Sequence, residues 1–128
     1  MIYVDTSVIL AHVLAEDRSP PDDLWAETLV SSRLTTYETW VRLNARKLAA
    51  SHGNLAREAL GRLAIVELSA IVLERALEAF PAPVRTLDAL HLATLAFLTG
   101  QRQRLKLATY DQRMADAATR LGFELHPL

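Results

Sequence analysis

Asp5, Glu38 and Asp111 each come directly after a short, strand-like run of residues. Strands that alternate with helices form parallel sheets, whose carboxyl ends share one edge where ligands bind. If the first strand is central, its neighbours bring these three carboxylates close together. Asp88 opens a predicted helix instead, and its spacing alone does not bring it beside the other three. The first expectation is therefore a carboxylate cluster at one edge of a parallel sheet.

Clustered carboxylates repel one another unless a proton or a cation neutralises them. The chain has no cysteine and its histidines show no convergent spacing, so an ion held here would have oxygen ligands. Hard ions such as Mg²⁺ and Mn²⁺ prefer such sites. They activate water and stabilise the oxygens of a phosphoryl displacement. The pattern therefore favours metal-dependent hydrolysis of a phosphodiester bond.

Each acid also has an explanation that involves no ligand. Asp5 and Asp111 could cap helices by accepting hydrogen bonds from free N–H groups. Thr35 and Glu38 fit a capping box, and Asp88 lies in a first turn, where the helix dipole favours an anion. Any one acid is explained in this way, but the convergence of three on one sheet edge favours the metal site.

The elements that must position these acids alternate along the chain. Strands are predicted at residues 2–5, 33–36, 64–68, 105–110 and 123–125. Helices are predicted at residues 7–16, 22–30, 37–50, 54–63, 69–80, 86–100 and 112–121. Gly53 is expected to end one helix and Thr86 to cap another, and residues 101–104 read as a polar turn. The alternation predicts a three-layer α/β fold with a mostly parallel sheet of about four to five strands.

Composition excludes several classes of protein. The 128 residues are 51% hydrophobic and 23% charged, as expected for one globular domain spanning residues 1–128. No apolar run approaches the roughly 20 residues that cross a bilayer. The first residues lack a basic region and are strand-like, so a secretory signal is not expected. The absence of cysteine fits a cytoplasmic setting. A net charge of −1 gives no bulk signal for nucleic acid.

Four short motifs occur in order along essentially the whole chain. They are Tyr3–Ser7, Thr36–Thr39, Leu87–Ala93 and Ala108–Asp111. Each motif is weak alone, but together and at these separations they resemble the motifs of PIN-domain ribonucleases. The closest resemblance is to the VapC-type toxins of bacterial and archaeal toxin–antitoxin pairs.

The resemblance implies a PIN-like fold and a Mg²⁺ or Mn²⁺ site made by four acids. They are Asp5, Glu38, Asp88 and Asp111, so the resemblance adds Asp88 to the cluster. The implied activity is endonucleolytic hydrolysis of structured RNA, of the tRNA or rRNA class. The implied partners are the RNA substrate and a separately encoded antitoxin, which often blocks the site with an arginine. A homodimer or a toxin–antitoxin complex is expected. Association with a membrane is not expected.

Further residues could support such a site. Thr6, Ser7 and Thr109 could hydrogen-bond the acids or a metal-bound water. Four arginines that flank the acidic motifs are candidates for phosphate contacts. These arginines are Arg42, Arg46, Arg85 and Arg113. His91 follows Asp88 by three and could face the site, although a buried, hydrogen-bonded structural role is favoured. Asp116 is expected on a solvated helix face.

Other classes of protein fit less well. A haloacid-dehalogenase-like phosphatase needs a second acid two positions after Asp5, where Ser7 stands. A receiver-type signalling module needs an aspartate after the third strand, where Leu68 and Ser69 stand. A PIN nuclease without a toxin role and a non-catalytic PIN-like interaction module remain as alternatives. The presence of all four acids argues against the second.

Overall fold

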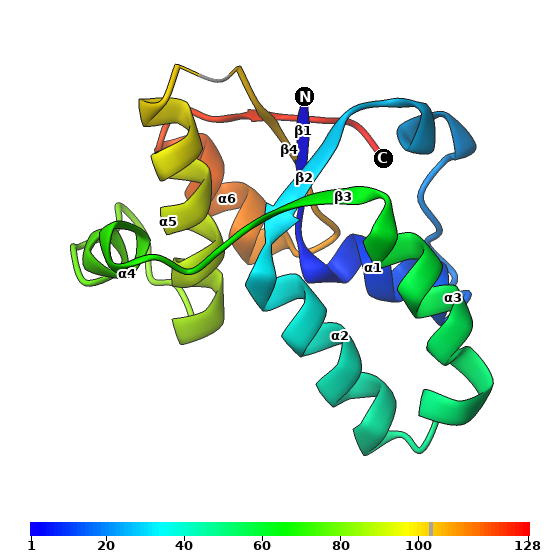
Figure 1. The fold of residues 1–128 in the computed structure, drawn as a ribbon. Coiled ribbons are helices and arrows are strands. Elements are labelled where there is room, and N and C mark those ends of the chain that lie inside the picture. The colour runs from blue at the N-terminus through cyan, green and yellow to red at the C-terminus, as the bar shows by residue number, and fades with distance from the viewer. Residues whose placement is uncertain (103) are drawn as a thin grey trace.

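Five parallel strands form the centre of the computed structural model, which describes residues 1–102 and 104–128. The sheet order is β3-β2-β1-β4-β5, and all four pairings are parallel (Figure 1). The strands are β1 (Ile2–Val4), β2 (Leu29–Ser32), β3 (Leu63–Val66), β4 (Lys106–Ala108) and β5 (Glu124–Leu125). The predicted fold class is therefore confirmed, with β1 central as the site requires.

Helices cover both faces of this sheet. They are α1 (Thr6–Val13), α2 (Arg33–Ala45), α3 (Ala49–Gly61), α4 (Ala70–Ala76), α5 (Thr86–Gly100) and α6 (Gln112–Arg120). A 3₁₀ turn, η1 (Asp22–Ala26), precedes β2. Figure 1 shows α1 and α3 on one side of β1, and α5 and α6 on the other. Within the described residues, no helix has both the length and the apolar character needed to cross a membrane.

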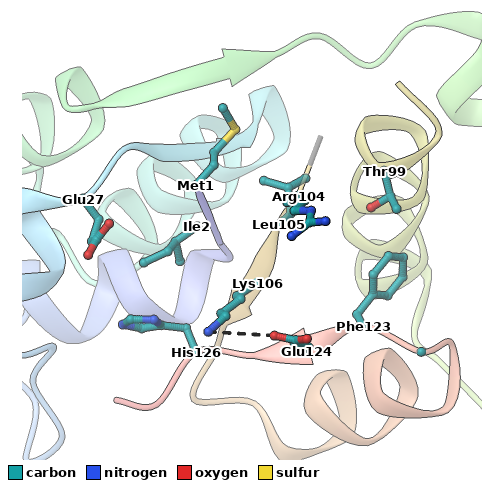
Figure 2. Close-up of a pocket in the computed structure, with 11 residues that line it drawn as sticks. Met1, Ile2, Glu27, Thr99, Arg104, Leu105, Lys106, Phe123, Glu124 and His126 are labelled. Carbon is teal, nitrogen blue, oxygen red and sulfur yellow. Dashed lines mark ion pairs between the residues drawn. The ribbon is translucent and has the colours of Figure 1, made fainter. Parts of the chain in front are cut away.

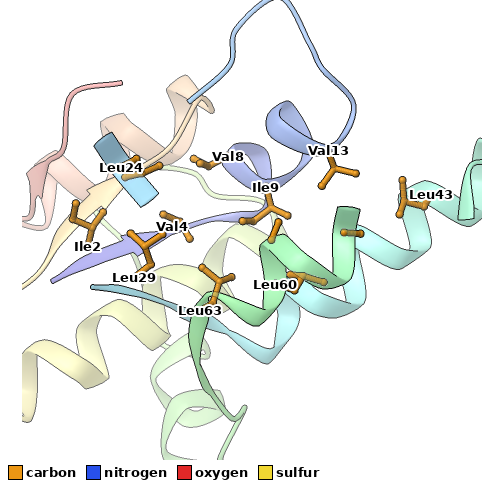
Figure 3. Packing of buried hydrophobic residues seen from close by; sticks show 13 residues of the cluster. Ile2, Val4, Val8, Ile9, Val13, Leu24, Leu29, Leu43, Leu60 and Leu63 are labelled. Atoms are coloured by element: carbon orange, nitrogen blue, oxygen red, sulfur yellow. The ribbon is translucent and has the colours of Figure 1, made fainter. Parts of the chain in front are cut away.

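The alternation of side chains along β1 divides the core into two parts. Ile2 and Val4 face a cluster that includes Ile9 of α1 and Leu60 of α3 (Figure 3). Tyr3 faces the opposite cluster, formed mainly by α5 and α6. All three β1 residues are buried, because a central parallel strand is covered on both faces. This double burial fixes the end of β1, and with it the position of Asp5.

The second strand lies earlier in the chain than the sequence predicts. Leu29 and Val30, predicted on a helix, form β2 and pair with Ile2 and Tyr3. Residues 33–36, predicted as a strand, form the first turn of α2. All four β2 residues are buried, so the segment shows no alternation. Periodicity cannot distinguish such a strand from a short buried helix.

Several helix boundaries also differ from the predicted ones. Gly53 lies inside α3 rather than at a helix end, and the break comes earlier, where Lys47 has a φ of 57°. A Cβ on Gly53 would lie 3.2 Å from Trp40, so this glycine permits close helix packing. Arg85, not Thr86, is the N-cap residue of α5. Of the predicted polar turn at 101–104, residue 103 lies outside the described residues.

Candidate active site

All four predicted acids line one cavity of about 470 Å³, at the carboxyl ends of β1 and β4. Asp5 follows β1 and Asp111 follows β4, the neighbouring strand. Glu38 comes from α2 and Asp88 from α5. The remaining lining residues are Thr6, Ser7, Leu10, Arg42, Arg85, Thr86, Leu87 and His91. Segments up to 106 residues apart, from Asp5 to Asp111, thus meet at one sheet edge.

Asp5 is the most enclosed of these carboxylates, at 4% exposed. It occupies the N-cap position of α1, but its side chain makes no capping hydrogen bond. Instead, Ser7 Oγ donates to Oδ1 at 2.5 Å and Thr109 Oγ1 donates to Oδ2 at 2.8 Å. Burial raises the pKa of Asp5, and this outweighs the opposing effects of His91 and the two hydroxyls. The carboxylate is therefore held by polar groups in a site that penalises its charge.

Asp111 combines a structural role with a place in the cavity. Its Oδ1 accepts hydrogen bonds from the backbone N–H of Arg113 at 2.9 Å and of Met114 at 3.3 Å. It therefore caps α6, as one reading of the sequence predicts. Its other oxygen, Oδ2, accepts a hydrogen bond from Arg85. Capping fixes the orientation of the carboxylate and leaves the second oxygen to face the cavity.

Arg85 lies between two of the acids. Its Nε donates to Asp88 Oδ2 at 2.8 Å, and its Nη2 donates to Asp111 Oδ2. The arginine side chain is 58% exposed, whereas that of Asp88 is only 13% exposed. Sequence reasoning predicts phosphate contacts for Arg85, but in this structure its guanidinium neutralises two carboxylates.

Glu38 reaches the cavity from the second turn of α2, because this helix begins directly after β2. The N-cap residue of α2 is Ser32, whose Oγ accepts from Leu34 N at 3.0 Å, so the alternative of a Thr35–Glu38 capping box does not hold. Thr6 Oγ1 donates to Glu38 Oε1 at 2.8 Å, and His91 Nε2 lies 2.7 Å from the same oxygen. Burial alone would raise the pKa of Glu38, but these contacts lower it below its ordinary value.

His91 belongs to the cavity although sequence reasoning favours a structural role. It is 2% exposed and lines the cavity one helical turn after Asp88 on α5. The spacing of three is the only sequence signal for this position, since residues three apart on a helix share a face. The histidine is both buried and hydrogen-bonded, as expected, and one of its partners is a candidate catalytic acid.

The remaining predicted residues divide into two groups. Thr6, Ser7 and Thr109 all hydrogen-bond acids of the cavity. Arg42 lines the cavity and lowers the pKa of Glu38 further by its charge. Arg46 and Arg113 are exposed and are not among the lining residues. Asp116 is also exposed and outside the cavity, and it accepts a hydrogen bond from Gln112 at 2.8 Å.

The chemistry of the lining fits a hard divalent cation, because its four acids offer only oxygen atoms. In residues 1–102 and 104–128, however, no group of three or more histidine, aspartate or glutamate side chains is gathered as a ready-made metal site. Arg85 pairs with two of the acids and His91 pairs with a third. For the four acids to share one metal ion, Asp88 and Asp111 would have to break at least their ion pairs with Arg85.

A larger cavity, of about 630 Å³, lies at the opposite end of the sheet (Figure 2). Met1 and Ile2 line it at the start of β1, and Lys106 at the start of β4. Lys106 forms an ion pair at 3.8 Å with Glu124, its neighbour on β5, and both residues line this cavity. None of the four predicted acids lines this cavity. It is therefore not the candidate active site, although it is the larger of the two cavities.

Comparison with known proteins agrees with the predicted fold and family. The family model of the PIN domain matches residues 2–120. Ribonuclease VapC46 of Mycobacterium tuberculosis is 35% identical over 126 residues, covering 94% of this chain and 92% of that protein. Two solved structures show the same fold at lower identity.

One is the VapC20 toxin of M. tuberculosis, which cleaves the sarcin–ricin loop; it has a TM-score of 0.69 and 22% identity, covering 99% of this chain and 100% of that chain. The other is a toxin–antitoxin complex from Klebsiella pneumoniae, with a TM-score of 0.60 and 21% identity, covering 88% of each chain. The family match and the identity to VapC46 show that this chain belongs to the PIN domain family and, within it, to the VapC ribonucleases.

Proposed function

We propose that this chain is a Mg²⁺- or Mn²⁺-dependent endoribonuclease and the toxin of a toxin–antitoxin pair. Its substrate is structured RNA of the tRNA or rRNA class. The observation that carries the proposal is that Asp5, Glu38, Asp88 and Asp111, from four separate segments, line one cavity. Four converging carboxylates are costly to fold unless a cation binds among them, and function is the reason to retain such a cost.

The four acids would hold the metal, and each is oriented by a neighbour. Ser7 and Thr109 bond one oxygen each of Asp5, which fixes the plane of this carboxylate. The cap on α6 orients Asp111. A bound Mg²⁺ or Mn²⁺ supplies an activated water and neutralises charge on the reacting phosphate. Such a cation would stabilise the charge of Asp5, which is poorly solvated because burial raises the pKa of this carboxyl.

Recognition of the RNA backbone is assigned to arginines at the cavity. Arg42 and Arg85 both line it, and guanidinium groups bind phosphate oxygens with two parallel hydrogen bonds. Arg46 and Arg113 lie outside the cavity and could contact phosphates only beyond the scissile one. The RNA class follows from likeness to the VapC ribonucleases; the cleavage of the sarcin–ricin loop is a property of VapC20.

The proposed partner is an antitoxin that covers this cavity. The likeness to a protein of the Klebsiella toxin–antitoxin complex supports such a partner. Asp88 and Asp111 already bind the guanidinium of Arg85. An arginine supplied by the antitoxin would bind carboxylates of this cavity in the same way. We also propose that residues 1–128 act as a single nuclease domain in the cytoplasm, as a homodimer or in complex with the antitoxin.

Cleavage of a structured RNA by the purified chain tests the proposal. Mg²⁺ or Mn²⁺ should promote cleavage and EDTA should stop it. Asp5→Asn and Asp88→Asn should each lower the rate by at least about 100-fold, because groups that merely orient metal ligands already contribute 10- to 100-fold. Asp116→Asn, which removes an exposed acid outside the cavity, should cleave normally. Wild-type cleavage by Asp5→Asn would exclude the catalytic role.

Growth of a host without the antitoxin distinguishes a toxin from a nuclease with another role. Induced expression of the wild-type chain should arrest growth, and expression of Asp5→Asn at the same level should not. Normal growth with confirmed folded wild-type protein would favour a PIN nuclease without a toxin role. Absence of cleavage under all metal conditions would favour the non-catalytic interaction module.

A further inference from the structure

A chain of hydrogen bonds runs from the core to one of the candidate metal ligands. Tyr3 Oη lies 2.8 Å from His91 Nδ1, and His91 Nε2 lies 2.7 Å from Glu38 Oε1. Tyr3 is 1% exposed and His91 2% exposed. The two rings meet edge to face, with centroids 5.9 Å apart and an interplanar angle of 80°. The imidazole is thus fixed by packing as well as by its two nitrogen contacts.

The carboxylate of Glu38 determines the direction of its hydrogen bond with His91. An ionised carboxylate only accepts hydrogen bonds, so Nε2 of His91 must carry the hydrogen that bonds Glu38. The Tyr3 hydroxyl can donate to Nδ1 or accept from it, so it pairs with this nitrogen whether or not Nδ1 carries a hydrogen. A ring flipped about its axis would turn a carbon toward Glu38 and lose both bonds. Tyr3 therefore selects the ring orientation that donates to Glu38.

Both donors to Glu38 bond the same oxygen. Thr6 Oγ1 and His91 Nε2 reach Oε1 at 2.8 Å and 2.7 Å, and Thr6 Oγ1 and His91 Nε2 lie 3.3 Å apart. Among the hydrogen bonds within residues 1–102 and 104–128, none involves Oε2. Oε1 is thus anchored, and Oε2 is the oxygen that a cation can use.

We propose that His91 is a positioning residue, which anchors Oε1 of Glu38 so that Oε2 is presented to the metal, and that Tyr3 holds His91 in the donating orientation. This inference rests on the proposed function, because it requires Glu38 to be a metal ligand. His91 itself is not a ligand in this arrangement, since both of its nitrogens are already engaged. A histidine with a purely structural role would stabilise the fold without influencing metal affinity.

Two variants of His91 separate these roles. Gln places an amide N–H near the position of Nε2 and can still donate to Glu38, whereas the shorter Asn cannot reach it. Isothermal titration of the folded proteins with Mn²⁺ measures the affinity, and urea unfolding measures stability. His91→Asn should weaken Mn²⁺ binding by about 10- to 100-fold, the range for groups that orient metal ligands. His91→Gln should recover binding to within about threefold of wild type. Equal affinity for both variants, whether weakened or unchanged, would overturn the inference.

The double variant Glu38→Ala/His91→Asn tests whether His91 acts through Glu38. It should bind Mn²⁺ as weakly as Glu38→Ala alone, because the anchored group is already absent. A further loss in the double variant would show that His91 acts by another route. Unchanged affinity in Glu38→Ala would instead contradict the proposed function, since Glu38 would not be a ligand.

Tyr3→Phe provides a second test in case His91→Asn does not fold. Phe keeps the ring and its packing but removes the hydroxyl that selects the orientation of His91. Tyr3→Phe should weaken Mn²⁺ binding about threefold or more. The same substitution made in the His91→Gln protein should have a smaller effect. Wild-type Mn²⁺ affinity in Tyr3→Phe, with a folded protein, would exclude the orienting role of Tyr3.

Discussion

Arg85 Nε lies 2.8 Å from Oδ2 of Asp88, and the same guanidinium also bonds Asp111. A cation from the chain itself thus occupies two of the four carboxylates proposed to bind a metal. Because the arginine side chain is 58% exposed, water screens these ion pairs and each contributes little. The contact is strong enough to order the site but weak enough to be exchanged for a divalent ion.

Replacement of Arg85 by Ala should therefore tighten the binding of Mn²⁺. Removal of a screened competing cation corresponds to roughly 0.5–1 kcal/mol, or about two- to fivefold in affinity. Titration calorimetry with Mn²⁺ measures the change. Arg85→Lys keeps the charge, so its affinity for Mn²⁺ should lie between those of wild type and Arg85→Ala. Arg46→Ala removes an arginine outside the cavity and should bind Mn²⁺ as wild type does. Weaker binding by Arg85→Ala would mean that the guanidinium supports the metal site rather than competing for it.

Metal-free Asp5→Asn should gain stability relative to wild type as the pH rises from acid to neutral, although its cleavage rate should fall by about 100-fold or more. Burial raises the pKa of Asp5 above its ordinary 3.8, so the folded state holds this proton more tightly than the unfolded state. Raising the pH from below 3.8 through the folded-state pKa therefore costs wild-type stability, and the cost persists above it. Asn does not titrate and escapes this loss.

Urea unfolding in EDTA at a series of pH values measures this effect. The difference in free energy of unfolding between Asp5→Asn and wild type should grow from acid to neutral pH and then level off. The lowered pKa of Glu38 acts in the opposite direction, with stability lost as the pH falls, but it is common to both proteins. A difference that stays constant with pH would show that burial does not penalise the charge of Asp5.

Asp5 and Asp111 could be located from the sequence, because each follows a strand with a clear apolar run and a following helix. Parallel strands end at one edge, so strand identity alone brings these two acids together. Glu38 is different. The sequence predicts that it directly follows a strand, but it lies six positions after Ser32, and the turns of α2 carry it to the cavity. The sequence thus places Glu38 beside the other acids from a displaced strand, and its role as a metal ligand stays a prediction.

Arg85 and His91 show what the sequence could not predict. Whether Arg85 turns toward phosphates or toward Asp111 depends on the packing of α5 beside α6, which no local pattern encodes. The link between His91 and Tyr3 joins residues 88 positions apart. Sequence reasoning could identify His91 as buried and hydrogen-bonded, but its partners follow only from the three-dimensional fold.

Thr109→Val should destabilise the fold. The Thr109 hydroxyl donates to Asp5 Oδ2 at 2.8 Å and accepts from Asp111 N at 3.0 Å, so Val leaves two polar groups without this partner. An unsatisfied buried group costs about 1–3 kcal/mol. Urea unfolding at neutral pH measures the loss. Thr109→Ser keeps the hydroxyl and should lose less than about 1 kcal/mol. Equal loss in both variants would assign the effect to the methyl group instead.

Two glycines of α3 provide a matched test of the packing against α2. Ala is favoured over Gly inside helices by up to about 1 kcal/mol. A Cβ on Gly61 would meet no atom within 4 Å, so Gly61→Ala should stabilise the fold. A Cβ on Gly53 would lie 3.2 Å from Trp40 Cη2, so the indole ring must shift and Gly53→Ala should lose that gain.

The difference between Gly61→Ala and Gly53→Ala, measured by urea unfolding, reports this contact. Gly61 is the last residue of α3, where Ala gains less over Gly than inside the helix, so helix propensity cannot explain a less stable Gly53→Ala. Gly53→Ala should be the less stable of the two by about 1 kcal/mol or more. Arg57 lies over the Trp40 ring at 5.0 Å and also limits its movement. Equal stabilisation by both variants would mean that Trp40 moves freely, and Gly53 would then have no packing role between α2 and α3.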